Sequence, residues 1–187
     1  MVKIGERIPD LKLQVYHEGE IKEVKLSDFR GKWLVIAFYP ADFTFVCPTE
    51  LEELAEHYGE FGELGAEVLS ISTDTAYVHK AWHDTSPAIK KIRFPMGADP
   101  AGVACRAFGT YIPSEGVSLR ATFIVDPEGV LRAMEIHDNS IGRSAREILR
   151  KLRASKYVAE HPGEVCPASW EPGKETLKPS LELVGKI

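Results

Sequence analysis

An α/β fold around one mixed sheet is predicted by three observations. The run WLVIAFY at residues 33–39 is continuously apolar, which is typical of a strand covered on both faces. A helical pattern at 47–62 and a second apolar strand at 67–73 follow it, so these segments form a βαβ unit. Residues 121–158 read as two strands and a helix. A βαβ unit followed by ββα is the order of elements in a thioredoxin-like fold.

The first half of the chain supplies a hairpin and the βαβ unit. Residues 11–26 alternate apolar and polar positions on both sides of HEGE, which predicts an N-terminal β-hairpin extension. After Cys47, apolar residues recur every three or four positions, and Gly62 with Gly65 ends the helix. A further helix is expected at about 75–83.

The second half begins with a short strand at about 92–95 and a helical stretch at 100–108. The segments ATFIVD and VLRAMEIH then predict two strands joined by a DPEG turn, with a helix at about 143–158 behind them. The strand at 130–137 comes late in the chain and is a candidate edge of the sheet.

The periodic pattern stops beyond residue 158, where prolines interrupt the chain. We therefore expect a thioredoxin-like domain over 1–158 and a C-terminal arm over 159–187. This arm has little core of its own, so it is expected to find apolar contacts on another surface, such as a second chain.

Composition excludes several classes of function. The length of 187 residues suggests one domain, and a net charge of -5 gives no global attraction for nucleic acid or anionic membranes. The N-terminus has no apolar signal core, and the longest apolar run is far below the ~18 residues of a membrane span. We expect a cytoplasmic protein without nucleic-acid or membrane partners.

Three cysteines, Cys47, Cys105 and Cys166, form neither an even disulfide framework nor a C-x-x-C pair. This count disfavours a disulfide-stapled secreted scaffold and the commonest zinc sites. In a reducing compartment, a disulfide between them would be transient and chemical.

Cys47 is expected at or near the N-cap of a helix. Pro48 suits the first helical position, and Glu50 suits the first turn of a positive helix dipole. Free backbone N–H groups and the dipole stabilise a thiolate there. The alternative is a small buried residue in a strand-to-helix turn, and position alone leaves both interpretations open.

The whole chain resembles the peroxiredoxins. Pro40, Thr44 and Cys47 match the P-x-x-x-[ST]-x-x-C motif of that family, and FYPADFTFVCPTE is similar to the alkyl hydroperoxide reductase C type in particular. EVCPASW marks the typical two-cysteine class. The likeness extends through ISTDTAYVHKAWH, LRATFIVDPEGV, IGRSAREILR, HPGEVCPASW and PSLELVGKI.

This resemblance implies roles for seven residues. Cys47 would be the peroxidatic cysteine and Cys166 the resolving cysteine. Thr44 would offer its hydroxyl to the thiolate and the peroxide, and Pro40 would shield the pocket from water. Arg120 would keep the thiolate ionised and stabilise charge as the O–O bond breaks. The supporting residues would be a second arginine, Arg150, and the carboxylate that orients it, Glu50.

The resemblance also implies a reaction and its partners. A thiol peroxidase of this kind passes through a sulfenic acid and an intersubunit disulfide. Its substrates would be hydrogen peroxide and organic hydroperoxides, and its reductant either a flavoprotein disulfide reductase or a thioredoxin-type donor. A homodimer that assembles into a decamer is expected. The alternatives are a redox-gated holdase or peroxide sensor on the same fold, and a cysteine hydrolase, which would need a histidine beside Cys47.

Other residues carry weaker signals. His79 and His83 have a spacing that can bind metal, but HKAWH lacks the glutamate of H-E-x-x-H, so packing beside Trp82 is favoured and no metal is expected. No nucleotide-binding glycine motif is visible, and we expect no cofactor. Cys105 is interpreted as a core residue.

Four arginines recur on one side of the last expected helix. A solvated surface is the favoured interpretation for this stripe, Arg150 excepted, over a site for an acidic partner. The four are Arg143, Arg146, Arg150 and Arg153.

Overall fold

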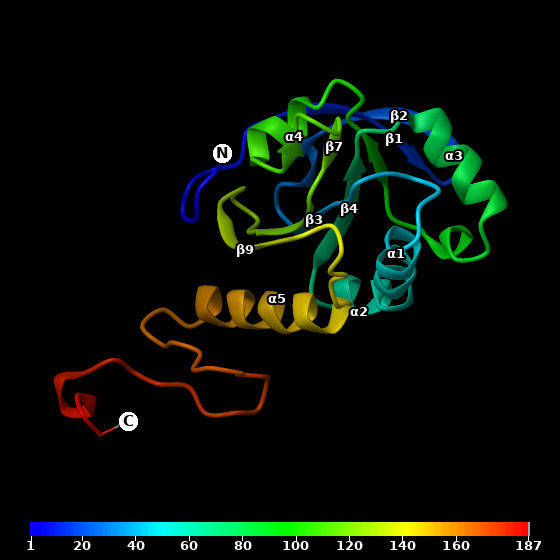
Figure 1. Cartoon of the computed structure of the whole chain (residues 1–187). Coiled ribbons are helices and arrows are strands. Elements are labelled where there is room, and N and C mark those ends of the chain that lie inside the picture. The colour runs from blue at the N-terminus through cyan, green and yellow to red at the C-terminus, as the bar shows by residue number, and fades with distance from the viewer. Residues whose placement is uncertain (187) are drawn as a thin grey trace. The chain divides into compact units, whose positions relative to one another are not determined.

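Seven strands form the central sheet, in the order β2-β1-β5-β4-β3-β8-β9. The computed structural model, shown in Figure 1, describes residues 1–186 and divides into two compact units, Met1–Ala145 and a second that begins at Arg146. The sheet belongs to the first unit. Residue 187, the last of the expected arm, lies outside the described residues, and the expected domain boundary after residue 158 stays a prediction.

The sheet is mixed, as the sequence predicts. Strands β3, β4 and β5 run parallel to one another, and every other neighbouring pair is antiparallel. The short strands β6 and β7 pair separately. The bounds are β1 Lys12–His17, β2 Glu20–Lys25, β3 Trp33–Phe38, β4 Ala66–Ser72, β5 Met96–Ala98, β6 Tyr111–Ile112, β7 Val117–Ser118, β8 Arg120–Val125 and β9 Leu131–His137.

Short helices connect the strands of the first unit, and the longest helix lies in the second (Figure 1). The α-helices are α1 Cys47–Glu56, α2 Tyr58–Glu63, α3 Ala76–Thr85, α4 Val103–Phe108 and α5 Ala145–Glu160. Single 3-10 turns are η1 Leu26–Phe29, η2 Ile89–Lys91 and η3 Leu181–Leu183. None of the helices within residues 1–186 has the length and apolar character that a membrane crossing needs.

The core of the first unit is built on β3 and β8, in which every residue is buried. Phe38, Phe108 and Phe123 bring β3, α4 and β8 together, with ring centroids 4.8–5.7 Å apart. Cys105 is fully buried on α4. Burial, followed by the charge of Asp99, raises the pKa of Cys105 to about 12, which agrees with its interpretation as a core residue.

Two expected elements differ in the structure. The helix expected over 47–62 is two helices, because the chain leaves helical geometry at His57, whose Nδ1 lies 2.6 Å from Glu60 Oε1. Two glycines in YGEFGE lower the helix propensity beyond this point. The strand expected at 92–95 is β5, which begins at Met96 because the preceding Pro95 has no N–H to donate.

Strand β9 is an edge of the sheet, as expected from the sequence. Its side chains alternate, and Met134 and Ile136 are among those exposed on the outer face. Within residues 1–186 the only strand that pairs with β9 is β8, although Leu131 at its start also exchanges backbone hydrogen bonds with Gly5 and Glu6 of the N-terminal segment. Beyond Leu131, the other side of β9 is an open sheet edge.

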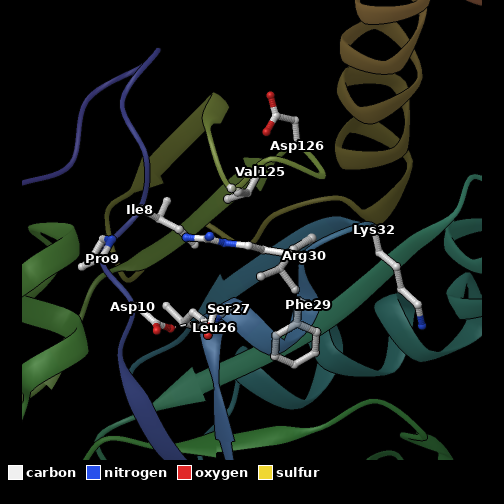
Figure 2. Close-up of a pocket in the computed structure, with 12 residues that line it drawn as sticks. Ile8, Pro9, Asp10, Leu26, Ser27, Phe29, Arg30, Lys32, Val125 and Asp126 are labelled. Atoms are coloured by element: carbon white, nitrogen blue, oxygen red, sulfur yellow. Dashed lines mark hydrogen bonds between the residues drawn. The ribbon is translucent and has the colours of Figure 1, made fainter.

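A narrow pocket lies behind the N-terminal segment (Figure 2). Ile8, Pro9 and Asp10 face η1 across it, where Asp10 accepts a 2.9 Å hydrogen bond from the backbone N–H of Ser27. Its volume of about 10 Å³ is enough for only a single water molecule. No residue of loop 40–46 or of α1 lines it, so this pocket is separate from Cys47.

The aromatic cluster predicts a large cost for truncation. We expect Phe123→Ala to lower the free energy of unfolding by about 3–5 kcal/mol, because it leaves a cavity between β8 and α4. Guanidinium denaturation monitored by circular dichroism measures this change. Phe45→Ala is the matched control, since that side chain is 92% exposed. Equal effects of the two substitutions would contradict the prediction.

Candidate active site around Cys47

Cys47 is the first residue of α1 and is completely buried. The N-cap is Val46, whose carbonyl accepts hydrogen bonds from the backbone N–H groups of Thr49 and Glu50. Pro48 therefore occupies the second helical position, where its missing N–H costs nothing. The expected placement near the N-cap holds to within one residue, and the thiol lies in the positive first turn of the helix.

The loop before Cys47 is held in an unusual conformation. Phe43 adopts a left-handed backbone with φ of 56°, which is uncommon for a side chain of this size, and its ring centroid lies 5.8 Å from that of Trp82 on α3. The backbone N–H of Asp42 donates to Asp74 at 2.8 Å. Thr44 donates its hydroxyl to the Ala41 carbonyl at 2.8 Å. The loop is thus ordered by specific bonds rather than by regular structure.

A buried Asp42–His79 pair ties this loop to α3. His79 Nδ1 lies 2.7 Å from Asp42 Oδ2, and its Nε2 lies 3.0 Å from the Gly97 carbonyl. A carbonyl only accepts hydrogen bonds, so Nε2 carries the proton. Burial raises the pKa of Asp42, against the opposing pull of His79. Tyr39 also donates to Asp42, at 2.6 Å.

Both histidines of HKAWH are engaged by protein groups. His83 Nε2 lies 3.2 Å from the Ile92 carbonyl, and its Nδ1 lies 3.4 Å from the Tyr16 hydroxyl. Within residues 1–186, no three side chains of His, Cys, Asp or Glu are placed to hold a metal ion together. His79 acts here as a structural tie for the loop that leads to Cys47.

Arg120 brings a positive charge to the thiol. It is the first residue of β8, is 4% exposed, and places Nη1 3.3 Å from Cys47 Sγ. The same nitrogen donates to Glu50 Oε2 at 2.7 Å, and Nε donates to the Asn139 carbonyl at 2.9 Å. These bonds fix the guanidinium against the sulfur. A cation at this distance stabilises a thiolate over a thiol.

Arg143 completes the cluster from the opposite side of Glu50. Its Nε and backbone N–H donate to Glu50 Oε1 at 2.8 and 2.9 Å, and Nη2 donates to Oε2 at 3.1 Å. Nη1 reaches the Ala121 carbonyl at 2.7 Å. Burial raises the pKa of Glu50, but Arg143 and then Arg120 outweigh it, and the net pKa is lowered. One carboxylate therefore faces two cations in a buried site.

The structure brings together three of the residues predicted for the site: Cys47, Glu50 and Arg120. Thr44 and Pro40 lie in the loop that enters α1, and the Thr44 hydroxyl is directed at Ala41. The expected roles of these two residues stay predictions. Cys166 and Arg150 belong to the second unit, so their expected relation to Cys47 also stays a prediction.

Sequence reasoning missed Arg143. The expectation of a solvated position on the last helix was wrong for this residue, because α5 begins at Ala145 and Arg143 is 6% exposed. The signal in the sequence was its place directly after Gly142 and before the helix. A Cβ on Gly142 would lie 3.3 Å from the Val46 side chain, so glycine permits the close approach to the start of α1.

The geometry is that of a nucleophilic cysteine with a charge-stabilising partner. A buried thiolate beside a fixed guanidinium can attack an electrophilic atom, and the same guanidinium can stabilise negative charge on a departing oxygen. The group in contact with the thiol is an arginine, not the histidine that a cysteine hydrolase would need as its base.

Comparison with known proteins agrees with this geometry. A model of the AhpC/TSA family matches residues 4–134, and one described as the C-terminal domain of 1-Cys peroxiredoxin matches 154–186. Alkyl hydroperoxide reductase C from Pseudomonas aeruginosa is 51% identical over 187 residues, and that from Salmonella typhimurium is 52% identical over the same length. Each alignment covers 100% of both chains.

Solved structures confirm the thioredoxin-like fold. The crystal structure of Enterococcus faecalis AhpC superposes with a TM-score of 0.86 at 50% identity, covering 89% of this chain and 100% of the other. The reduced 2-Cys peroxiredoxin of Plasmodium vivax superposes with a TM-score of 0.91 at 35% identity. That match covers 96% of this chain and 94% of the other.

The charge cluster predicts an acid sensitivity. Because the pKa of Glu50 is below its ordinary 4.5 in the folded protein, the unfolded chain binds the proton more readily. The stabilisation is therefore present above pH 4.5 and is lost as the pH falls below it. We expect Glu50→Gln to flatten this part of the pH dependence of the unfolding free energy, measured by denaturation at several pH values. A variant at the exposed Glu115, Glu115→Gln, should keep the wild-type slope. A wild-type slope in Glu50→Gln would refute the assignment.

Proposed function

Because this chain belongs to the AhpC/TSA family, we propose that it is a thiol-dependent peroxidase that reduces hydrogen peroxide and organic hydroperoxides. The observation that carries the proposal is the 3.3 Å contact between Arg120 Nη1 and Cys47 Sγ, with Glu50 holding the arginine in place. A charged donor fixed beside a buried sulfur supplies what cleavage of an O–O bond requires.

The first step is an attack by the Cys47 thiolate on one peroxide oxygen. The S–O bond forms as the O–O bond breaks, and the departing oxygen takes a proton to leave as water or an alcohol. Cys47 becomes a sulfenic acid. Arg120 stabilises the charge that moves to the departing oxygen, and Thr44 offers a hydroxyl to the same atoms. Pro40 helps to exclude water.

Glu50 and Arg143 act on the reacting atoms through Arg120. Glu50 receives the second guanidinium and so fixes the direction in which Arg120 points. This geometry supports Arg143 as a positioning residue. Arg150 keeps its proposed place as a further arginine of the site, on the basis of the sequence resemblance.

Cys166 closes the reaction in the second step. Its thiol attacks the sulfenic sulfur of Cys47, water leaves, and a disulfide forms. We place this disulfide between two subunits, as the resemblance to typical two-cysteine peroxiredoxins implies. Two electrons from a flavoprotein disulfide reductase or a thioredoxin-type protein then regenerate both thiols.

The assembly we propose is a homodimer formed through β9, five of which join into a decamer. The open edge of β9 beyond Leu131, with Met134 and Ile136 exposed beside it, supports pairing with a second copy. We place the protein in the cytoplasm, because its three cysteines form no even disulfide framework.

The thiol chemistry is tested by substitution of each buried cysteine. We expect Cys47→Ser to abolish peroxide-dependent consumption of reducing equivalents, because the hydroxyl is not ionised near neutral pH. Cys105→Ala should retain most of the turnover. The rate is measured with each class of electron donor supplied separately. Stoichiometric rather than catalytic consumption by the wild type would favour the holdase or sensor interpretation.

The disulfide and the assembly are tested on one sample. Light scattering on the reduced protein should give a mass far above 20.8 kDa. After one equivalent of peroxide, non-reducing electrophoresis should show a covalent dimer that disappears in Cys166→Ser. A monomeric band with an internal disulfide would contradict the intersubunit step, and a persistent monomer in solution would contradict the assembly.

A further inference from the structure

A short turn, residues 138–142, leads from the end of β9 toward α5. Asp138 orders this turn, because its Oδ1 accepts a 2.8 Å hydrogen bond from the backbone N–H of Ser140. The Asp138 carbonyl accepts another, at 3.0 Å, from the backbone N–H of Ile141. Asn139 lies between these bonded groups and is therefore presented in a fixed direction.

Asn139 contacts Arg120 through two of its atoms. The Nε of Arg120 donates to the Asn139 backbone carbonyl at 2.9 Å, and the Arg120 backbone N–H donates to Asn139 Oδ1 at 3.2 Å. The pairing of β8 with β9 ends at Arg120 and His137, so the Asn139 side chain supplies an acceptor just beyond the last paired residue. Its Nδ2 lies 3.5 Å from the Ser118 carbonyl, which agrees with an amide whose oxygen faces Arg120.

The bond to Oδ1 satisfies a backbone donor that has little access to water. Arg120 is 4% exposed, and Asn139 is half-buried beside it. A buried donor that loses its acceptor costs more free energy than an average hydrogen bond contributes. Because the same residue also supplies the carbonyl that receives Nε, a shift of Asn139 moves both acceptors of Arg120 together.

A planar guanidinium needs contacts at both ends to be held in one orientation. At one end, Arg120 Nη1 lies 3.3 Å from Cys47 Sγ and donates to Glu50 Oε2 at 2.7 Å. Contacts at this nitrogen alone leave the plane free to turn about it. The bond from Nε to the Asn139 carbonyl holds the other end. The direction of Nη1 toward the sulfur therefore depends on Asn139 as well as on Glu50.

We propose that Asn139 is a positioning residue for Arg120, and that its side-chain oxygen keeps the guanidinium directed at Cys47 during the attack on peroxide. This inference rests on the proposed function of Cys47 as the attacking thiolate. The S–O bond forms, the O–O bond breaks and the departing oxygen takes a proton, while Arg120 stabilises the charge. Position matters in such a step, since a misplacement of about 1 Å can slow a catalysed reaction about 100-fold.

The side-chain oxygen is tested by two substitutions of Asn139. Asn139→Leu keeps the size of the side chain and removes the acceptor. We expect oxidation of the Cys47 thiol by hydrogen peroxide, followed by rapid quenching and mass spectrometry, to be about tenfold slower, which equals about 1.4 kcal/mol, or one hydrogen bond. Asn139→Asp keeps an oxygen that accepts from Arg120 and should react at nearly the wild-type rate. Equal slowing in both variants, or none in Asn139→Leu, would overturn the proposal.

A neighbouring side chain provides the matched control. Ser140 is exposed in the same turn, and Ser140→Ala keeps the backbone bond to Asp138, so this variant should react as the wild type does. Asn139→Ala decides the question where Asn139→Leu does not fold, as judged by circular dichroism. We expect a several-fold slower oxidation in it, and an unchanged rate would then refute the assignment.

A double-substitution cycle tests whether Asn139 acts through Arg120. Arg120→Lys removes the Nε donor and with it the bond to the Asn139 carbonyl. Addition of Asn139→Leu to Arg120→Lys should slow oxidation of Cys47 by at most about twofold, against about tenfold when Asn139→Leu is made alone. Additive effects would show that Asn139 acts by another route, and would contradict the proposal.

Alkylation of Cys47 without peroxide separates this inference from the proposed function. A guanidinium turned away from the sulfur stabilises the thiolate less, so the pH profile of Cys47 alkylation should move to higher pH in Asn139→Leu. The profile of Asn139→Asp should stay close to that of the wild type. Identical profiles in all three proteins would overturn the inference. Absence of peroxide reduction by the wild type would instead refute the proposed function, and the alkylation result would stand apart from it.

Discussion

One buried carboxylate organises the site around Cys47. Glu50 lies one helical turn after Cys47 and accepts hydrogen bonds from Arg120 of β8 and from Arg143, which precedes α5. Three segments far apart in the sequence are therefore assembled around a single charge. Loss of that charge would leave two buried guanidinium groups without this counter-charge, which is far costlier than loss of an exposed ion pair. Fold stability and thiol chemistry share this interaction.

The ordered site around Cys47 suits the proposed attack on peroxide, but it opposes the proposed disulfide with Cys166. A disulfide needs Cα atoms within about 7 Å, and a sulfur atom that is completely buried at the start of α1 must first become accessible. Helix α1 has only 10 residues and ends at the break before α2. Such a short helix can open locally. The Asp42–His79 pair and the hydrogen bond from Thr176 to Glu164 each order a segment that precedes a cysteine.

Local sequence patterns predicted the strands and helices, but not the side-chain pairs that join distant parts of the chain. The apolar runs of β3 and β8 located the sheet, and Pro48 placed Cys47 at the start of a helix, because each depends on neighbouring residues. The hydrogen bonds from Arg143 to Glu50 and from Thr176 to Glu164 join side chains 93 and 12 residues apart, and no periodicity records such pairs. The helix break at His57 was missed because the apolar spacing continues past it. Histidine is a weak helix former, and the contact of its side chain with Glu60 outweighs that spacing.

The two completely buried cysteines differ in the charge that lies beside them, not in their burial. Cys105 and Cys47 both have no exposed surface. Asp99 lies near Cys105, and its negative charge adds to the effect of burial in opposing ionisation. Arg120 contacts Cys47 instead, and supplies the cation that a thiolate needs.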